Sequence, residues 1–312
     1  MVFSRVNQPS DESASSMKIL LLGKNGQVGW ELQRALAPLG ELVALDRHSV
    51  EHCGDLSDLD GLRATVRALR PDVIVNAAAY TAVDKAESDR DVAMRINAQA
   101  PQALAEEAAR LGALVVHYST DYVFDGGGVV PWVESVRAIP CNYYGQTKLA
   151  GEQAIVSSGC SYLIFRTSWV YGAHGNNFAK VMLGLAAQRE SLSIVNDQIG
   201  APTGAELLAD VAAHAIAQTL SNPGLAGTYH LSATGETSWY LYACFVIERA
   251  RQLGRNLIIK DVQGIASAAY PTAAVRPLNS RLDTRKIQTA FGIALPRWEE
   301  GVSRMLTEVL AP

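Results

Sequence analysis

Two side chains suited to proton transfer stand four residues apart in the segment Tyr144-Gly-Gln-Thr-Lys148. A separation of four puts both of them on one face of a helix. A free tyrosine has a pKa of about 10, and a neighbouring ammonium group stabilises the phenolate and lowers that pKa. Thr120 ends an apolar run upstream that predicts a strand, and its hydroxyl there can hydrogen-bond a carbonyl oxygen. These residues predict a site that moves a proton to or from the oxygen of a carbonyl or an alcohol.

Three glycines, Gly23, Gly26 and Gly29, follow an aliphatic run near the start of the chain. In this spacing the first glycine permits a tight turn, the second lets the backbone approach a phosphate, and the third lets a helix pack close to the sheet. The N-terminus of that helix offers free N–H groups and a partial positive charge to a pyrophosphate. Asp46 ends the next predicted strand, 20 residues after Gly26, where a carboxylate binds ribose hydroxyls. The motif therefore predicts a nicotinamide dinucleotide beside the proton-transfer pair.

Asp46 and Arg47 favour different forms of that cofactor. The carboxylate of Asp46 repels a 2′-phosphate and favours NADH, whereas Arg47 can pair with the phosphate of NADPH. We therefore expect the protein to use both. Asp55 and Leu56 follow the second strand and can cover the adenine, although Asp55 is equally suited to cap a helix. The remaining residues expected at the cofactor flank the third glycine or follow the third predicted strand: Gln27, Val28, Ala78, Ala79, Tyr80 and Thr81.

Apolar runs alternate with helical periodicities through the first half of the chain. Strands are predicted at residues 18–22, 41–46, 73–78, 114–119 and 161–167. Helices are predicted between them at residues 28–39, 59–69, 92–111 and 143–157. This alternation predicts an α/β fold, a Rossmann-type doubly wound parallel sheet with helices on both faces.

The pattern changes after residue 168. Helices are predicted at residues 176–189, 207–220 and 239–253 and from residue 298, and a strand at 228–231, with turn-rich segments between them. We expect residues 17–168 to form the dinucleotide-binding domain and residues 169–312 to form mainly a smaller, interleaved substrate-binding lobe, with some segments returning to the first domain. Residues 1–16 are polar and lack an apolar core, so we expect a disordered extension rather than a signal peptide.

Composition excludes several classes of function. The 312 residues carry a net charge of −4 without a long basic run, which argues against nucleic acid as a partner. No apolar stretch reaches the ~18–20 residues that would cross a membrane. The cysteines form no CxxC pair, and buried reduced thiols are expected at Cys53, Cys141, Cys160 and Cys244. With no targeting signal recognised, a cytoplasmic location is expected.

Several segments outside the cofactor motifs carry a more specific resemblance. The chain resembles the extended short-chain dehydrogenases/reductases and, within them, the family of dTDP-4-dehydrorhamnose reductases. The matching segments are GKNGQVGWEL (23–32), NAAAYTAVDKAE (76–87), STDYVFDG (119–126), YGQTKLAGE (144–152), RTSWVYG (166–172), NDQIGAPT (196–203) and RPLNSRLDT (276–284).

The resemblance implies that hydride passes from NADPH or NADH to C4 of dTDP-4-keto-6-deoxy-L-mannose and gives dTDP-L-rhamnose, a precursor of cell-surface polysaccharide. In this scheme Tyr144 gives the proton to the oxygen, Lys148 tunes Tyr144 and holds the nicotinamide ribose, and Thr120 assists. Asp121 and Trp169 match positions that contact the sugar.

Two further roles follow from the resemblance alone. Tyr122 is a weaker candidate for the wall of the sugar site. Members of the family have been described as Mg²⁺-linked homodimers, and the matching carboxylates are Glu31, Glu206 and Glu299. Carboxylates with waters suit Mg²⁺, although scattered glutamates are usually solvated surface. The metal in this role is structural, because the hydride transfer itself requires none.

Two other functions compete with the reductase. One is a non-catalytic regulatory subunit resembling the β-subunit of methionine adenosyltransferase, which binds a dinucleotide in a similar fold. The other is a related sugar-nucleotide epimerase or dehydratase. A dehydratase needs an acid/base pair after the threonine, and here Tyr122 follows Asp121, which argues against that chemistry.

Overall fold

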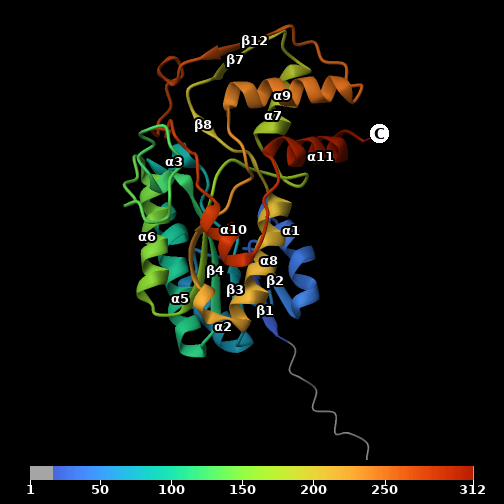
Figure 1. The fold of residues 1–312 in the computed structure, drawn as a ribbon. Coiled ribbons are helices and arrows are strands. Elements are labelled where there is room, and N and C mark those ends of the chain that lie inside the picture. Colours follow the sequence, from blue (N-terminus) through green and yellow to red (C-terminus); the bar gives the residue numbers. More distant parts are fainter. Residues whose placement is uncertain (1–16, 312) are drawn as a thin grey trace, which may run out of the picture.

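The computed structural model describes residues 17–311, so the prediction for residues 1–16 lies outside the described part of the chain. Its centre is a parallel sheet of six strands in the order β2-β1-β3-β4-β5-β10 (Figure 1). The strands are β1 (Lys18–Leu22), β2 (Glu41–Leu45), β3 (Val73–Asn76), β4 (Leu114–Thr120), β5 (Ser161–Thr167) and β10 (Gly227–His230). The order reverses direction between β1 and β3, and such a switch point opens a crevice at the carboxyl ends of the strands.

Helices cover both faces of this sheet because its strands are apolar on both sides. In β1, Ile19 and Leu21 join the core under α1 (Gln27–Leu36), α8 (Ala205–Ser221) and α10 (Arg285–Phe291). Leu20 and Leu22 point the other way, into the core under α2 (Leu59–Leu69), α5 (Ala100–Leu111) and α6 (Tyr143–Ser157). The alternation of side chains along one strand thus feeds two separate cores.

A smaller lobe lies beyond the carboxyl ends of the strands, at the top of Figure 1. It consists of α7 (Phe178–Ala186), α9 (Trp239–Gln252) and α11 (Trp298–Leu310), which share a third core around Tyr242 and Trp298. A parallel pair of strands, β7 (Ser191–Val195) and β12 (Asp261–Ile265), borders it. Two short pairs connect it to the cleft: β6 (Val170–Tyr171) with β9 (Thr203–Gly204), and β8 (Ile199–Gly200) with β11 (Thr237–Ser238). The sequence did not predict β7, β12 or these pairs.

The single helix predicted at residues 92–111 is wrong. The structure has α4 (Arg90–Met94), one wide π-helical turn, η2 (Arg95–Gln99), and then α5. Pro101 lacks the N–H that would bond the Asn97 carbonyl in a regular α-helix. The Asn97 amide bonds both the backbone N–H and the carbonyl of Tyr80, at 2.8 and 3.0 Å, and so holds the wide turn against the end of β3.

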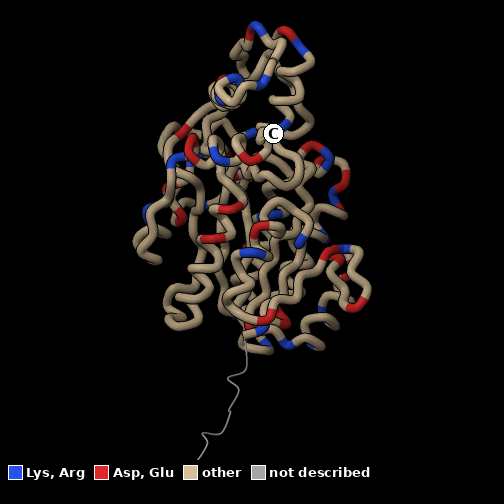
Figure 2. Tube along the Cα trace, turned by 90° about the vertical axis from the view of Figure 1, so that its right-hand side faces the viewer, with Lys and Arg blue, Asp and Glu red and all other residues tan. Residues whose placement is uncertain are grey.

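The remaining elements are short. The helix expected at residues 28–39 ends at Leu36 and continues as a single 3₁₀ turn, η1 (Ala37–Leu39), because Pro38 also lacks an N–H. The other short elements are α3 (Val83–Ala86), η3 (Asp121–Val123), η4 (Pro223–Leu225) and η5 (Ser267–Ala269). In residues 17–311 no helix is long and apolar enough to cross a membrane. Acidic and basic positions are interspersed along the trace in Figure 2.

The four cysteines form no disulfide. Only Cys160 is buried, so the expectation of buried thiols was wrong for Cys53, Cys141 and Cys244, which are partly exposed.

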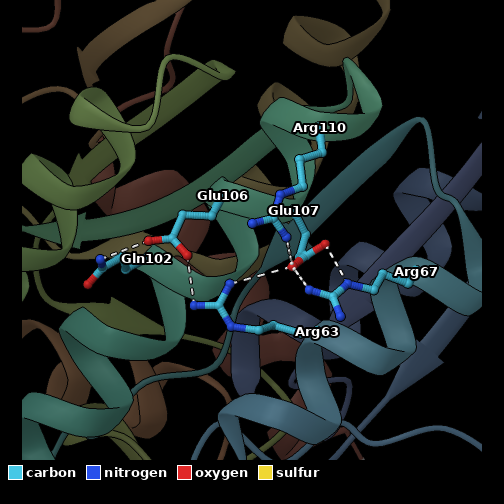
Figure 3. A network of polar contacts seen from close by, with 6 residues as sticks. All are labelled: Arg63, Arg67, Gln102, Glu106, Glu107 and Arg110. Atoms are coloured by element: carbon cyan, nitrogen blue, oxygen red, sulfur yellow. Dashed lines mark hydrogen bonds and ion pairs between the residues drawn. The ribbon is translucent and has the colours of Figure 1, made fainter.

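A buried carboxylate joins α2 to α5 (Figure 3). Glu107 is 2% exposed, and its oxygens lie 2.6 and 2.9 Å from the guanidinium of Arg67 and 2.6 Å from that of Arg110. Arg63 reaches Glu107 at 3.5 Å and its neighbour Glu106 at 2.7 Å. Hydrogen bonding from Arg67, opposed by burial, leaves the pKa of Glu107 below its usual value. A charge buried to this extent is stabilising only while its partners are present.

Replacing Glu107 with Gln tests this network. The substitution keeps the shape but removes the charge, and we expect it to lower the free energy of unfolding by about 1–3 kcal/mol. A carboxylate whose pKa is lowered on folding stabilises above its unfolded pKa of about 4.5 and loses that effect as the pH falls through the lower folded value. The difference between wild type and Glu107→Gln in urea unfolding should therefore shrink in acid. Glu106→Gln, at a more exposed carboxylate, is the control, and an equal loss there would contradict the role given to Glu107.

Candidate active site

One cleft of about 1170 Å³ lies at the carboxyl edge of the sheet, between the sheet and the smaller lobe. It brings the two predicted motifs together, since the turn after β1 and the Tyr/Lys helix α6 both line it. The predicted site residues along its wall are Gly23, Gly26, Gln27, Val28, Asp46, Arg47, Asp55, Leu56, Ala78, Ala79, Thr81, Thr120, Asp121, Tyr122, Tyr144, Lys148 and Trp169. Gly29, Tyr80, Glu31, Glu206 and Glu299 are not part of this lining.

The glycine turn has the geometry that an anion requires. Gly23 has a φ of +87°, and a Cβ there would stand 2.8 Å from the backbone nitrogen of Ala78. A Cβ on Gly29 would stand 2.0 Å from the Gly23 carbonyl oxygen, so the third glycine permits the close packing of α1 on the turn, as predicted. Gly26 is the N-cap of α1 and has no side chain to cap it. The free N–H groups of α1 therefore face the cleft, and these residues fit a dinucleotide pyrophosphate.

Asp46 lies in the same cleft wall as the glycine turn and is held in its charged form. Its carboxylate accepts hydrogen bonds from the Asn25 amide at 2.5 Å and from the backbone N–H of His48 at 2.8 Å. The bond from His48 is the main reason that its pKa lies below the usual value. Arg47 lines the same wall with an exposed side chain. Asp46, which favours NADH, and Arg47, which favours NADPH, thus lie side by side in the cleft wall.

The other cofactor predictions have mixed outcomes. Leu56 is buried in the wall, and the Asp55 carboxylate accepts hydrogen bonds from Ser57. The alternative of Asp55 as a helix cap is wrong, because Asp58 caps α2. Tyr80 is not part of the cleft lining, and its hydroxyl donates to Asp89 at 2.8 Å.

Tyr144 and Thr120 meet at the centre of the cleft. Thr120 ends β4, and its hydroxyl donates to the Asp121 carboxylate at 3.2 Å. Burial is the main cause that raises the pKa of Tyr144 to about 12, with a smaller contribution from the charge of Asp121, while contact with the Thr120 hydroxyl opposes both. The expected lowering of this pKa by Lys148 is therefore wrong. The Tyr144 phenol stays protonated throughout the neutral range.

Lys148 points past Tyr144 into the sheet. It is 2% exposed, and its Nζ donates to the backbone carbonyl of Tyr118 at 2.6 Å and lies 3.2 Å from Nε2 of His117. Burial lowers the pKa of Lys148 to about 8, and the charge of Glu152 opposes that shift. Lys148 is thus attached to the backbone of β4, which explains why it does not stabilise a phenolate on Tyr144.

Asp121 is a buried carboxyl group beside this pair. It is 3% exposed, and one of its oxygens has no hydrogen-bond partner among the described residues. Burial raises its pKa to about 7, and the hydroxyl groups of Ser280 and Thr120 oppose the shift. A buried carboxyl oxygen without a partner beside an open cleft is available to a sugar hydroxyl.

Aromatic rings form the wall nearest to the smaller lobe. Trp169 has a φ of +49°, which is uncommon for a residue with a side chain, and its ring stacks on Trp239 at 3.6 Å. A Cβ on Gly200 would stand 2.8 Å from the Trp169 ring, so this position requires glycine. Tyr122 lies edge-on to Tyr144 with 5.8 Å between ring centroids. Stacking on Trp239 and close contact with Gly200 hold Trp169 in this uncommon conformation at the cleft.

The three glutamates predicted for a metal lie away from the cleft, and each has an arginine nearby. Glu31 lies 3.6 Å from Arg34, Glu206 lies 3.5 Å from Arg304, and Glu299 lies 2.8 Å from Arg297. Within residues 17–311 of one chain, no cluster of three or more acidic, histidine or cysteine side chains could hold a metal ion.

Sequence reasoning missed several residues that build the site. Asn25 and Trp239 line the cleft, while His117 and Asn97 stand behind α6. Pro101, inside the helix predicted at residues 92–111, was a readable signal of a broken helix, because it cannot donate to the carbonyl of Asn97 four residues earlier. Trp239 and His117 carried no local signal, because their roles depend on contacts with distant segments.

A family model described as the RmlD substrate binding domain matches residues 17–311. The chain belongs to this family. It is 58% identical to the dTDP-4-dehydrorhamnose reductase of Escherichia coli K12, over 94% of this chain and 98% of that protein. The predicted resemblance is confirmed.

Solved structures agree with the family assignment. The crystal structure of a dTDP-4-dehydrorhamnose reductase from Clostridium acetobutylicum has a TM-score of 0.85 and 34% identity, over 94% of this chain and 99% of that one. The reductase from Bacillus anthracis in complex with NADP has a TM-score of 0.84 and 34% identity, over the same shares of the two chains. Together with the six-stranded parallel sheet, these likenesses confirm the predicted fold class.

Proposed function

We propose that this protein reduces the C4 keto group of dTDP-4-keto-6-deoxy-L-mannose with NADPH or NADH and forms dTDP-L-rhamnose. One observation carries the proposal: the glycine turn, Thr120, Tyr144 and Lys148 line a single cleft. The 58% identity to a dTDP-4-dehydrorhamnose reductase supports the choice of substrate. The same identity favours the reductase over the regulatory subunit and the epimerase.

Each residue has a separate role in the proposed reaction. The bound cofactor supplies a hydride to C4 of the keto sugar. Tyr144 donates its phenolic proton to the C4 oxygen as negative charge develops there. A pKa of about 12 keeps this proton on Tyr144 at neutral pH, and the transfer is still downhill because an alkoxide is a stronger base than the phenolate of Tyr144. Thr120 can turn its hydroxyl from Asp121 to the same oxygen and orient it.

Other residues bind and orient the two molecules. The open N-terminus of α1 binds the pyrophosphate, and Asp46 accepts hydrogen bonds from the adenosine ribose. Lys148, which lines the cleft, would hold the nicotinamide ribose. Asp121 binds a sugar hydroxyl, and Trp169 packs against the sugar ring. These assignments rest on the cleft lining and on the chemistry of each side chain.

The direct test combines turnover with identification of the product. Oxidation of NADPH or NADH is followed by near-ultraviolet absorbance with enzymatically prepared dTDP-4-keto-6-deoxy-L-mannose, and the product is identified by NMR. Formation of dTDP-L-rhamnose supports the proposal. Cofactor binding without oxidation would favour a regulatory subunit, and protein purified with stoichiometric NAD that inverts a sugar centre would favour an epimerase.

Replacing Tyr144 with Phe removes the proton donor and leaves the fold and the cofactor cradle. We expect kcat to fall at least ~100-fold while the Kd for NADPH stays unchanged. Tyr143→Phe is the matched control, because its neighbouring ring faces Arg90, 4.8 Å from the ring centroid. Equal activity of wild type and Tyr144→Phe would remove Tyr144 from the mechanism.

Cofactor preference depends on the balance between Asp46 and Arg47. Asp46→Ala removes a negative charge from the ribose end of the cleft, so the ratio of kcat/KM for NADPH to that for NADH should rise about tenfold, or roughly 1.4 kcal/mol. Arg47→Ala should move the ratio the opposite way. A ratio that does not move in Asp46→Ala would mean that this carboxylate is not at the ribose.

We also propose that two copies of the chain form a homodimer with Mg²⁺ between them. Two observations support the fit of the carboxylates. Burial and the charge of Glu31 raise the pKa of Glu206, and one oxygen of Glu299 is buried without a partner. A divalent cation with carboxylate and water ligands would relieve both. The role is structural, because proton and hydride transfer use other residues.

Sedimentation with Mg²⁺ and with EDTA tests this arrangement. We expect Mg²⁺ to shift wild-type protein towards dimer and expect Glu206→Gln to lose that shift. Glu308→Gln is the control, since this exposed neighbour adds to the negative charge around Glu206. A dimer that is insensitive to EDTA and to Glu206→Gln would contradict the metal role. The division at residue 168 and the cytoplasmic location stay predictions.

A further inference from the structure

A segment of the smaller lobe contacts the glycine turn at the start of α1. Nε2 of His174 lies 3.0 Å from the backbone carbonyl oxygen of Asn25, and its imidazole stacks on Trp30 with 4.3 Å between ring centroids. The side-chain amide of Asn177 donates to Oε1 of Gln27 at 3.1 Å. His174 and Asn177 therefore attach the smaller lobe directly to the part of the chain that forms the cofactor cradle.

The contact from His174 fixes one peptide group of the turn. A carbonyl oxygen can only accept, so Nε2 of His174 carries a proton and donates to Asn25. The N–H of the same peptide group belongs to Gly26 and donates to the carbonyl of Gly23 at 3.0 Å. Both polar atoms of the peptide between Asn25 and Gly26 are thus bonded, which restricts the direction in which the Asn25 side chain leaves the turn.

That side chain uses part of the carboxylate of Asp46. Nδ2 of Asn25 donates to Oδ2 of Asp46 at 2.5 Å. Oδ1 accepts from the backbone N–H of His48 at 2.8 Å and from the hydroxyl of Ser49 at 3.3 Å. A carboxylate offers about four lone-pair sites, and these three donors leave one of them, on Oδ2, for a ligand.

One free site bears on the choice between NADH and NADPH. The adenosine ribose of NADH has two neighbouring hydroxyl groups, and a carboxylate that accepts from both of them favours NADH. Asn25 competes with these hydroxyl groups for Oδ2 of Asp46. NADPH carries a phosphate in place of the 2′-hydroxyl, so it loses less by this competition. Asn25 therefore removes part of the advantage that Asp46 gives to NADH.

We propose that Asn25 sets the cofactor preference of this protein by occupying Asp46, and that His174 of the smaller lobe holds Asn25 in place. Both are positioning residues, because their effect on the cofactor passes through Asp46. The inference deepens the proposed reductase function and rests on it, since it requires that the cleft bind NADPH or NADH.

The charges around Asp46 agree with this assignment. The backbone N–H of His48 is the main cause that lowers the pKa of Asp46, and the charge of Lys24 contributes. Asn25 adds a hydrogen bond without adding charge, so Asp46 stays ionised while its capacity to accept is reduced. Arg47 lies beside it in the cleft wall with an exposed side chain. A 2′-phosphate on this wall would meet Arg47 and a carboxylate that already has three donors.

Titration with each cofactor, without sugar nucleotide, tests the role of Asn25. Binding is followed by the fluorescence of NADPH or NADH. Asn25→Ala frees the occupied site on Asp46, so the ratio of the Kd for NADPH to the Kd for NADH should rise about fivefold, the size of one hydrogen bond. A general loosening of the turn would instead weaken both cofactors alike and leave the ratio unmoved, which would overturn the inference.

A double-mutant cycle shows whether Asn25 acts through Asp46. In an Asp46→Ala background the substitution Asn25→Ala should leave the ratio of the two Kd values unchanged, because the carboxylate that it frees is absent. An equal rise of the ratio in both backgrounds would mean that Asn25 acts on the cofactor by another route and would overturn the inference.

Two matched substitutions test His174. His174→Gln keeps an N–H donor for the Asn25 carbonyl and should keep the wild-type ratio. His174→Phe keeps an aromatic ring against Trp30 but loses the donor, so its ratio should move in the same direction as that of Asn25→Ala. Equal ratios in the two variants would contradict the role given to His174.

The outcomes separate this inference from the proposed function. An unmoved ratio in Asn25→Ala, with turnover in wild type, would overturn the inference alone. The expected ratios without turnover would support the inference and count against the reductase. Wild-type protein that binds neither NADPH nor NADH would overturn both.

Discussion

The attachment of α6 to the backbone of β4 is the interaction on which the site depends. Lys148 donates to the Tyr118 carbonyl at 2.6 Å, and this buried bond opposes sliding or rotation of the helix on the strand. One turn earlier, Tyr144 comes level with Thr120 at the end of β4. One turn later, Glu152 forms a buried ion pair with Arg166 on β5. The position of Tyr144 is thus set by polar contacts of its helix with two strands.

The wide turn before α5 serves the same attachment. Asn97, in that turn, donates to the Thr147 hydroxyl at 3.1 Å and also holds the backbone of Tyr80. A Cβ on Gly151 would stand 2.2 Å from the Asn97 carbonyl oxygen, so α6 passes this turn at close range. The end of β3, the wide turn and α6 are therefore one polar unit. Since the small residues Ala77, Ala78 and Ala79 follow β3 along the cleft, hydrogen bonds connect this part of the cleft wall with the helix that carries Tyr144.

Local sequence was enough to predict the parts of the site that follow local rules. The spacing of Gly23 and Gly29 predicted the turn, and the spacing of Tyr144 and Lys148 predicted their shared helix face. Both patterns depend only on residues that are close in the sequence. Tyr80 was expected at the cofactor from its neighbours in sequence, whereas its hydroxyl bonds Asp89, a contact that no local pattern marks. The β7–β12 pair was missed because its strands are short and far apart in the chain, and nothing local marks them as partners. The pKa of Tyr144 was predicted in the wrong direction because the effect of burial, which depends on the whole fold, outweighed the expected effect of Lys148.

One physical cause explains the electrostatics of the site. Burial raises the pKa of Asp121 to about 7 and that of Tyr144 to about 12, and it lowers that of Lys148 to about 8. Each shift favours the uncharged form of its own group, so Tyr144 is neutral near pH 7 while Asp121 and Lys148 change charge within about one pH unit of neutrality. In the proposed reaction, the charge that develops on the reduced carbonyl is poorly screened in such surroundings, and the proton from Tyr144 would neutralise it. Burial thus provides both halves of the chemistry: it keeps the proton on Tyr144 until the substrate oxygen becomes the stronger base, and it makes the transfer favourable when that happens.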